Sequence, residues 1–211
     1  MLKTLSVLFA FLMLVSCGKS GGGNSGSKGD AVTMQEIESG VVPQAALNFN
    51  MNLKMDGSFN GSEADKIHVA GELIKKVFAS EEFKDAILNF SYNGKKQFVD
   101  NGGLSNAQIY KKIIEGSEAL SPGIDNEMDL SMSVYKANNI VVGYTTPGEL
   151  GINMNSKFLD MNPGYKVTTN MVHEWLHKLG FVHAYNSTPS RPYSVPYAVG
   201  YLVARLAVKY L

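Results

Sequence analysis

The spacing of hydrophobic residues along the first half of the chain predicts one strand followed by helices. From Ala45 to Met55 apolar and polar residues alternate, which indicates a strand with one buried face. After two Gly-containing breaks the spacing becomes helical. The predicted helices start near Ser62, run from about Glu81 to Phe90, and run from about Asn106 to Leu120.

In the second half of the chain, the spacing of hydrophobic residues first predicts strands and then predicts helices again. From Met128 onward the period is two, and the predicted strands are Asp129–Tyr135, Ile140–Thr145 and Gly151–Asn155, with a turn at Pro147-Gly148. A helix over Lys166–Gly180 and a closing helix over Tyr197–Leu211 follow. There is no internal repeat and no second hydrophobic core. We therefore expect one α+β domain with a twisted mixed sheet.

The N-terminus has the pattern of an export signal. A single charge, Lys3, precedes an apolar run over residues 5–16, which is too short to span a bilayer comfortably, and the chain's only cysteine, Cys17, ends that run. The residues Leu14-Val15-Ser16-Cys17 resemble the lipobox of bacterial lipoproteins, which are cut before the cysteine. The resemblance implies a signal peptide over residues 1–16 and a lipid on Cys17. The alternatives are an ordinary signal peptide, or an N-terminal helix with an incidental cysteine.

The lipobox also implies a location. Residues 17–30 are Gly-rich and polar, so we expect a flexible tether that leads to a domain over residues 31–211. A lipoprotein of this kind is anchored in the bacterial cell envelope with its domain outside the cytoplasm. Gly18 is not an acidic retention residue, which favours the outer membrane.

The charge balance and the cysteine count limit the expected binding partners and the expected sources of stability. Nineteen basic and 19 acidic side chains balance, which gives no reason to expect a nucleic-acid partner. With one cysteine the exported domain has no internal disulfide, so its stability must come from packing and from any bound metal. We expect a monomer.

Three of the chain's four histidines lie within residues 173–183. His173 and His177 are four residues apart on a predicted helix, so their directions differ by only about 40° around its axis and both rings can bind one ion. Zn²⁺ binds such imidazoles at about 2.0–2.1 Å. Glu174 points too far round to be a ligand beside them. It is placed to hold a metal-bound water and take its proton.

Gly180 explains how a third histidine can reach the same ion. Glycine readily takes the left-handed conformation that ends a helix, and the turn it makes could bring His183 back. Three nitrogen ligands leave one position of a zinc ion open, as in catalytic rather than structural sites. The fourth histidine, His68, lies in the first helix, and we expect it to be a surface or packed residue. The alternative for the whole motif is a helix with exposed histidines and a glycine cap.

The sequence His173-Glu174-x-x-His177-x-x-Gly180-x-x-His183 resembles the extended zinc motif of the metzincin metallopeptidases. The resemblance implies zinc on the three histidines and hydrolysis of peptide or protein substrates with Glu174 as base and proton shuttle. It also implies an N-terminal subdomain with the sheet and the active-site helix, and a small C-terminal subdomain ending in a helix. By the same analogy Ile140–Thr145 is the edge strand that pairs with substrate.

One feature departs from that family. Metzincins place a methionine in a turn beneath the metal, and no methionine follows His183. If the segment Tyr193-Ser194-Val195-Pro196-Tyr197 takes that place, Val195 replaces the methionine and Tyr197 could approach the zinc or the transition-state oxyanion. The alternative, which we favour, is that Tyr193 and Tyr197 only pack a Pro-rich loop.

Two further functions fit the same motif. One is a catalytically silent zinc-binding or adhesion lipoprotein, although the retained Glu174 argues against it because metal binding alone needs only ligands. The other is a zinc amidase that acts on cell-wall peptides. Trp175, Leu176, Leu179 and Phe181 have the spacing of a helix packed on a sheet, so we expect them in the core.

Overall fold

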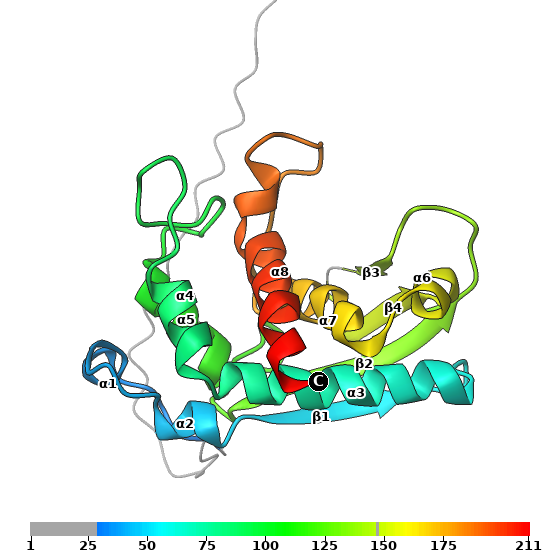
Figure 1. Ribbon diagram of the computed structural model, residues 1–211, viewed down its shortest axis with the longest axis horizontal. Coiled ribbons are helices and arrows are strands. Elements are labelled where there is room, and N and C mark those ends of the chain that lie inside the picture. The colour runs from blue at the N-terminus through cyan, green and yellow to red at the C-terminus, as the bar shows by residue number, and fades with distance from the viewer. Residues whose placement is uncertain (1–28, 147) are drawn as a thin grey trace, which may run out of the picture.

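The computed structural model describes residues 29–146 and 148–211. The predicted signal peptide, Cys17 and nearly all of the tether lie outside these residues, as does Pro147 of the predicted turn. The described chain contains eight α-helices and a four-stranded mixed sheet, in agreement with the α+β prediction (Figure 1). No helix in the described ranges is long and apolar enough to cross a membrane.

The sheet has the strand order β1-β2-β4-β3, and three of its four strands are parallel. Its strands are β1 (Asn50–Met55), β2 (Glu127–Tyr135), β4 (Gly151–Asn155) and β3 (Gly143–Thr145). β3 runs antiparallel to β4, with Tyr144 opposite Asn153, and it forms one edge of the sheet. The predicted strand over Ile140–Thr145 is therefore an edge strand, but only its last three residues are in strand conformation.

The first predicted strand began too early. Residues 44–47 form a short helix, α2 (Gln44–Leu47), which follows Pro43 and buries Ala45 and Ala46. Proline fixes the backbone angle φ in the range of a helix start, and small buried alanines suit a helix packed against the core. The alternating pattern is structural only from Asn50 onward, and the preceding helix α1 (Met34–Glu38) was not predicted.

Three helices fill the long connection between β1 and β2. They are α3 (Gly61–Phe78), α4 (Glu81–Leu88) and α5 (Asn106–Glu115). The start of α3 is a capping box on Asn60 and Glu63, rather than the predicted start at Ser62. The end of α5 is Gly116, in the left-handed conformation with φ 66°, so this helix is five residues shorter than predicted.

The last third of the chain contains α6 (Ser156–Met161), α7 (Gly164–Lys178) and α8 (Val195–Ala207), with 3-10 turns at Arg191–Tyr193 and Val208–Tyr210. Helix α7 packs against both α3 and α8, and α3 runs alongside β1 (Figure 1). The predicted helices over Lys166–Gly180 and Tyr197–Leu211 therefore exist, each beginning two residues earlier than expected.

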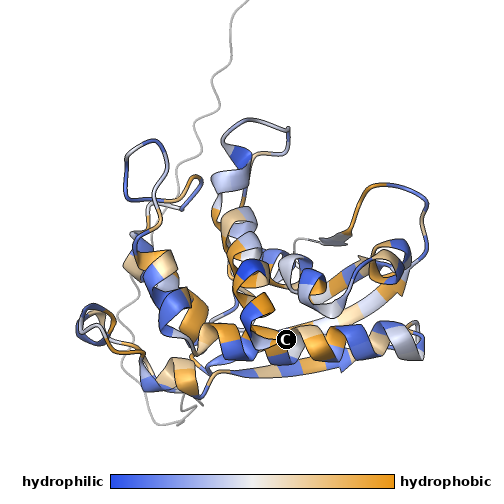
Figure 2. Ribbon diagram, in the orientation of Figure 1, coloured by the Kyte–Doolittle hydropathy of each residue, from blue (hydrophilic) through white to orange (hydrophobic). Residues whose placement is uncertain are grey.

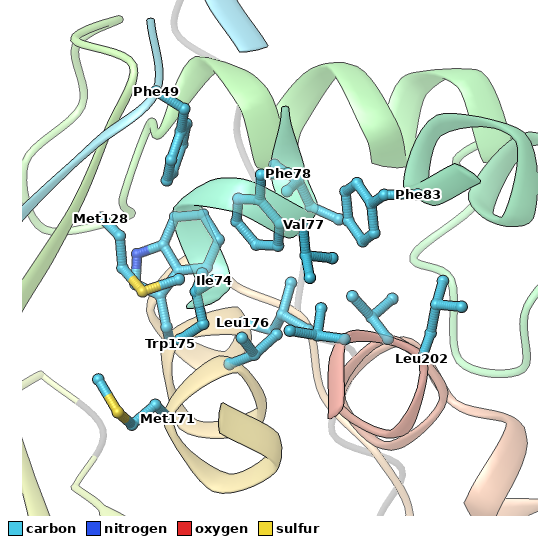
Figure 3. Close-up of a cluster of buried hydrophobic side chains, with 14 of the residues drawn as sticks. Phe49, Ile74, Val77, Phe78, Phe83, Met128, Met171, Trp175, Leu176 and Leu202 are labelled. Carbon is cyan, nitrogen blue, oxygen red and sulfur yellow. The ribbon is translucent and has the colours of Figure 1, made fainter. Parts of the chain in front are cut away.

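One hydrophobic core lies between the sheet and these helices. Trp175 and Leu176 of α7 point into it and meet Ile74 and Phe78 of α3 (Figure 3). The rings of Trp175 and Phe78 are 6.0 Å apart between centroids. Hydrophobic and hydrophilic segments alternate along α3 and α5, as expected for helices with one buried side (Figure 2).

Candidate metal centre

The end of α7 brings the three histidines of the motif together. Gly180 has φ 89°, and its amide donates to the carbonyl of His177 while that of Phe181 donates to the carbonyl of Leu176. These two bonds form a Schellman motif, which ends the helix and turns the chain sharply. The turn returns His183 to the face of α7 that carries His173 and His177.

The Nε2 atoms of the three rings converge on one point. Nε2 of His173 lies 3.3 Å from that of His177 and 3.2 Å from that of His183. Three nitrogens bound to one zinc ion at about 2.0–2.1 Å in a tetrahedral arrangement are about 3.3–3.4 Å apart. The two observed separations are therefore close to those expected around one tetrahedral metal ion.

The opposite nitrogens of the rings face backbone carbonyls. Nδ1 of His177 lies 2.7 Å from the carbonyl oxygen of Phe181, and Nδ1 of His183 lies 3.0 Å from that of Ala184. The His173 ring is hydrogen-bonded to the backbone of Pro196. Because a carbonyl accepts, each Nδ1 with such a partner carries the proton, and its Nε2 presents a lone pair.

Burial favours the neutral form of His173 and His177, which is the form that binds a metal ion. It lowers the pKa of His173 to about 3, helped by the neighbouring histidines and Arg191, and it also lowers the pKa of His177. Neutral imidazoles whose lone pairs point at one another have no proton to share. A cation between them would remove the repulsion, so the donor set fits a metal ion.

Glu174 lies beside the histidines and is buried. Burial raises the pKa of this carboxyl to about 7, while the charge of Lys178 and a hydrogen bond from the backbone of Thr145 oppose the rise. Thr145 belongs to β3, so the carboxylate is held between α7 and the edge strand. Glu174 is not a member of the histidine cluster, as the sequence predicted from its direction on the helix.

The two tyrosines after the third histidine have different surroundings. The Tyr193 ring packs on Tyr92, with 4.5 Å between centroids, as expected for a residue that holds a loop. The Tyr197 ring instead lies 4.4 Å from the His173 ring and 4.8 Å from that of His183. The guanidinium of Arg191 lies over the Tyr197 ring at 4.9 Å and hydrogen-bonds with its side chain.

A cleft of about 1110 Å³ opens over this centre. Its walls come from β3, α7, the loop before β4 and the segment after Gly180. The cleft is lined by all three histidines and by Glu174, Tyr144, Phe158, Arg191 and Tyr197. The arrangement leaves the convergent nitrogens accessible from one side, where a substrate could reach them.

Lys178 and Arg191 were not predicted as parts of this centre. Lys178 is buried, and its Nζ donates to the carbonyls of Gly151, at 3.0 Å, and Glu149. Burial lowers the pKa of this lysine. It connects the last turn of α7 to the start of β4. The only signal in the sequence was its position directly after the second histidine.

The structure also tests the burial predicted for the other residues of α7 and for His68. Trp175, Leu176 and Leu179 are fully buried, which confirms the prediction for α7, and Phe181 is buried while also lining the cleft. His68 is exposed on α3 and is not part of the histidine cluster.

Comparisons with known protein families, with curated proteins and with solved structures found no significant match to this chain.

Proposed function

We propose that this protein is a zinc-dependent peptidase in which His173, His177 and His183 hold the metal. The observation that carries the proposal is the set of convergent Nε2 atoms at 3.2 and 3.3 Å. Two of their opposite nitrogens lie within 3.0 Å of backbone carbonyls. Such second-sphere contacts fix the tautomer and direction of a zinc-binding imidazole. Three nitrogen donors facing an open cleft suit a catalytic rather than a structural ion.

Glu174 has the position of a general base. A zinc ion held by His173, His177 and His183 would supply Lewis acidity, which would make nearby water more acidic and polarise a substrate carbonyl. The Glu174 carboxylate accepts a proton from the attacking water and passes it to the leaving amine, so that one side chain serves both transfers. The contact with the Thr145 backbone holds the carboxylate in place.

The edge strand β3 suits an extended peptide substrate. It pairs on one side with β4 and lines the cleft with Gly143, Tyr144 and Thr145. A substrate backbone can add to such an edge as a further strand and thereby lie across the histidines. Neighbouring apolar side chains in the cleft, including Phe158 and Phe181, would contact substrate side chains.

A metzincin-type assignment is the finer form of this proposal. It is supported by the motif over residues 173–183, by the glycine turn before the third histidine, and by an antiparallel edge strand beside the active-site helix. Val195, in the place of the family's methionine, is fully buried at the start of α8. The position against the imidazoles is taken by Tyr197.

We also propose that Cys17 carries a lipid that anchors the protein in the bacterial cell envelope. The support is the motif Leu14-Val15-Ser16-Cys17 after a short apolar run. Incorporation of labelled palmitate into the wild-type protein, and its loss in Cys17→Ser, would test this proposal. Equal labelling of both proteins would exclude Cys17 as the lipidated residue.

The peptidase proposal is tested by measuring bound zinc and cleavage in the same samples. The full chain, purified in mild detergent, is compared with Glu174→Gln and with Glu38→Gln, an exposed glutamate on α1 that serves as the matched control. Peptide libraries and peptidoglycan fragments are the substrates. We expect about one zinc per chain in all three proteins, and cleavage reduced about 10²- to 10⁴-fold only in Glu174→Gln.

Other results would redirect the assignment. Zinc without cleavage in any of the three proteins would favour a zinc-binding or adhesion lipoprotein. Cleavage confined to peptidoglycan amides would favour a cell-wall amidase. A chain that binds no zinc would contradict the metal centre itself.

A further inference from the structure

Three carboxylates outside the histidine motif, those of Glu118, Asp125 and Asp129, lie close together. Glu118 lies in the loop after α5, Asp125 lies at the end of that loop, and Asp129 lies in β2. One oxygen of each lies within 4.8 Å of those of the other two. Glu118 is only 1% exposed, and both aspartates are partly buried.

No basic side chain neutralises this cluster. None of the ion pairs found in the described part of the chain involves Glu118, Asp125 or Asp129. Burial raises the pKa of Glu118 to about 7 and also raises that of Asp125, and the charge of Asp129 adds to both effects. Three neighbouring carboxylates without a counter-charge are unfavourable, and a bound cation would remove the repulsion.

The two carboxylate oxygens of Glu118 differ in their hydrogen bonding. Oε1 accepts hydrogen bonds from Nε1 of Trp175, at 2.7 Å, and from the backbone amide of Asp129, at 3.2 Å. Oε2 is sealed from solvent and has no hydrogen-bond partner. A buried carboxylate oxygen without a partner is unfavourable, so its presence points to a ligand that satisfies it.

The backbone and neighbouring side chains hold the aspartates in place. Oδ1 of Asp125 accepts from the amide of Glu127 at 3.1 Å, and Oδ1 of Asp129 accepts from Nδ2 of Asn52 at 2.7 Å. Gly116 allows the loop to close, because a Cβ there would lie 2.9 Å from Oδ1 of Asp125 and 2.3 Å from the carbonyl of Glu127. The cluster is therefore built by packing rather than gathered on a free surface.

We propose that Glu118, Asp125 and Asp129 bind a calcium ion. Carboxylate oxygens are hard ligands, which Ca²⁺ and Mg²⁺ prefer and which Zn²⁺ uses less than nitrogen and sulfur. Ca²⁺ binds oxygen at about 2.3–2.6 Å in flexible geometry, whereas Mg²⁺ demands near-ideal octahedral geometry at about 2.0–2.1 Å. Calcium can also complete its coordination shell with backbone carbonyls and water. Three carboxylates from a loop and a strand leave coordination positions that such ligands would have to fill.

The ion would act on the cleft through Glu118. This residue is hydrogen-bonded to Trp175, which lies between Glu174 and His177 on the helix that carries the metal ligands. The adjoining residues Ala119 and Leu120 line the cleft. Calcium would therefore hold one cleft wall against α7. The calcium site itself does not depend on the peptidase function, because its residues are separate from the histidines.

The test is a titration of the zinc-loaded full chain with CaCl₂. Trp175 is the only tryptophan, and its indole N–H bonds to a proposed ligand, so its fluorescence reports on the site directly. We expect saturable binding of about one Ca²⁺ per chain with Kd below about 1 mM, a change in Trp175 emission and a rise in the unfolding temperature. MgCl₂ at the same concentration should produce neither change.

Variants separate the site from general salt effects. Asp125→Asn and Asp129→Asn keep the oxygens that accept the bonds described above but remove charge, and we expect each to weaken Ca²⁺ binding at least about tenfold. Asp65→Asn, an exposed aspartate on α3, is the matched control and should bind as the wild type does. Equilibrium dialysis with radioactive calcium provides the same comparison without relying on fluorescence.

Three results would overturn the assignment. The first is that the wild type shows no saturable Ca²⁺ uptake up to 10 mM, which is about tenfold above the weakest affinity expected. The second is that both aspartate variants bind Ca²⁺ with unchanged affinity. The third is that Mg²⁺ produces the same response as Ca²⁺. If Asp125→Asn does not fold, Asp129→Asn decides alone, and wild-type uptake is measured in either case. Each of these results can occur with the zinc content and peptide cleavage intact, so they leave the peptidase proposal standing.

Discussion

The substitution Glu118→Gln tests the cost of ionising the buried carboxyl when calcium is absent. Gln keeps the oxygen that accepts from Trp175 and replaces the unpartnered oxygen by an uncharged amide group. It removes a charge from a buried site while preserving shape. We therefore expect the calcium-free variant to be more stable than the calcium-free wild type at alkaline pH.

The magnitude follows from the pKa of Glu118. The folded protein raises this pKa from 4.5 to about 7. The folded state thus binds the proton more tightly than the unfolded state does. The corresponding stability is fully present below pH 4.5 and is lost as the pH rises through about 7. Between pH 5 and pH 8 the wild type should lose about 2–3 kcal/mol of unfolding free energy from this group, which the variant cannot lose.

The assay is urea unfolding of calcium-free, zinc-loaded protein at pH 5 and pH 8, followed by Trp175 fluorescence. The quantity of interest is the unfolding free energy of Glu118→Gln minus that of the wild type, because all other titrating groups cancel in this difference. We expect it to grow by about 2–3 kcal/mol from pH 5 to pH 8. The matched control, Glu38→Gln, should show a constant difference. A constant difference for Glu118→Gln as well would refute the reasoning.

Three further predictions concern the histidine centre. Gly180→Ala should cost about 1–2 kcal/mol in urea unfolding, because φ 89° strains any residue with a Cβ, and it should weaken zinc binding in a competition titration by displacing His183. Tyr197→Phe removes only the hydroxyl at the cleft, so it should keep one zinc per chain and lower kcat by about tenfold or more with little change in KM. An unchanged kcat would show that Tyr197 only packs. Removal of zinc should lower the unfolding temperature, and zinc at a thousandfold excess over its Kd should restore about 4 kcal/mol; identical melting curves with and without zinc would contradict a folded-state site.

Sequence patterns predicted the parts of this protein that depend on neighbours along the chain. The pair His173 and His177 follows from helix geometry alone, and the turn at Gly180 follows from the conformational freedom of glycine. The core positions of α7 follow from helical period. These features need no knowledge of what packs against the helix.

The features that were missed depend on contacts between distant segments. The role of Lys178 appears only when the start of β4 lies beside the end of α7. Likewise Glu118 and Asp129 come together because α5 ends at Gly116 and the chain then enters β2. No local spacing in the sequence predicts this contact. The short helix α2 was missed because Ala45 and Leu47 also fit the alternating pattern of the strand after it.

The parallel pairing of β1 with β2 has a kinetic consequence. Asn50 lies opposite Glu127, so the edge strand β1 and its neighbour β2 must bring together residues 77 positions apart before they gain any hydrogen bond with each other. Closing a long loop costs entropy that only later contacts recover, and chains rich in such contacts fold slowly. The helices α3 and α4 can form early from local contacts, whereas the packing surface for α7 is complete only after the strands have met. We therefore expect the face of α7 that carries His173 and His177 to be the last part of this domain to become ordered during folding.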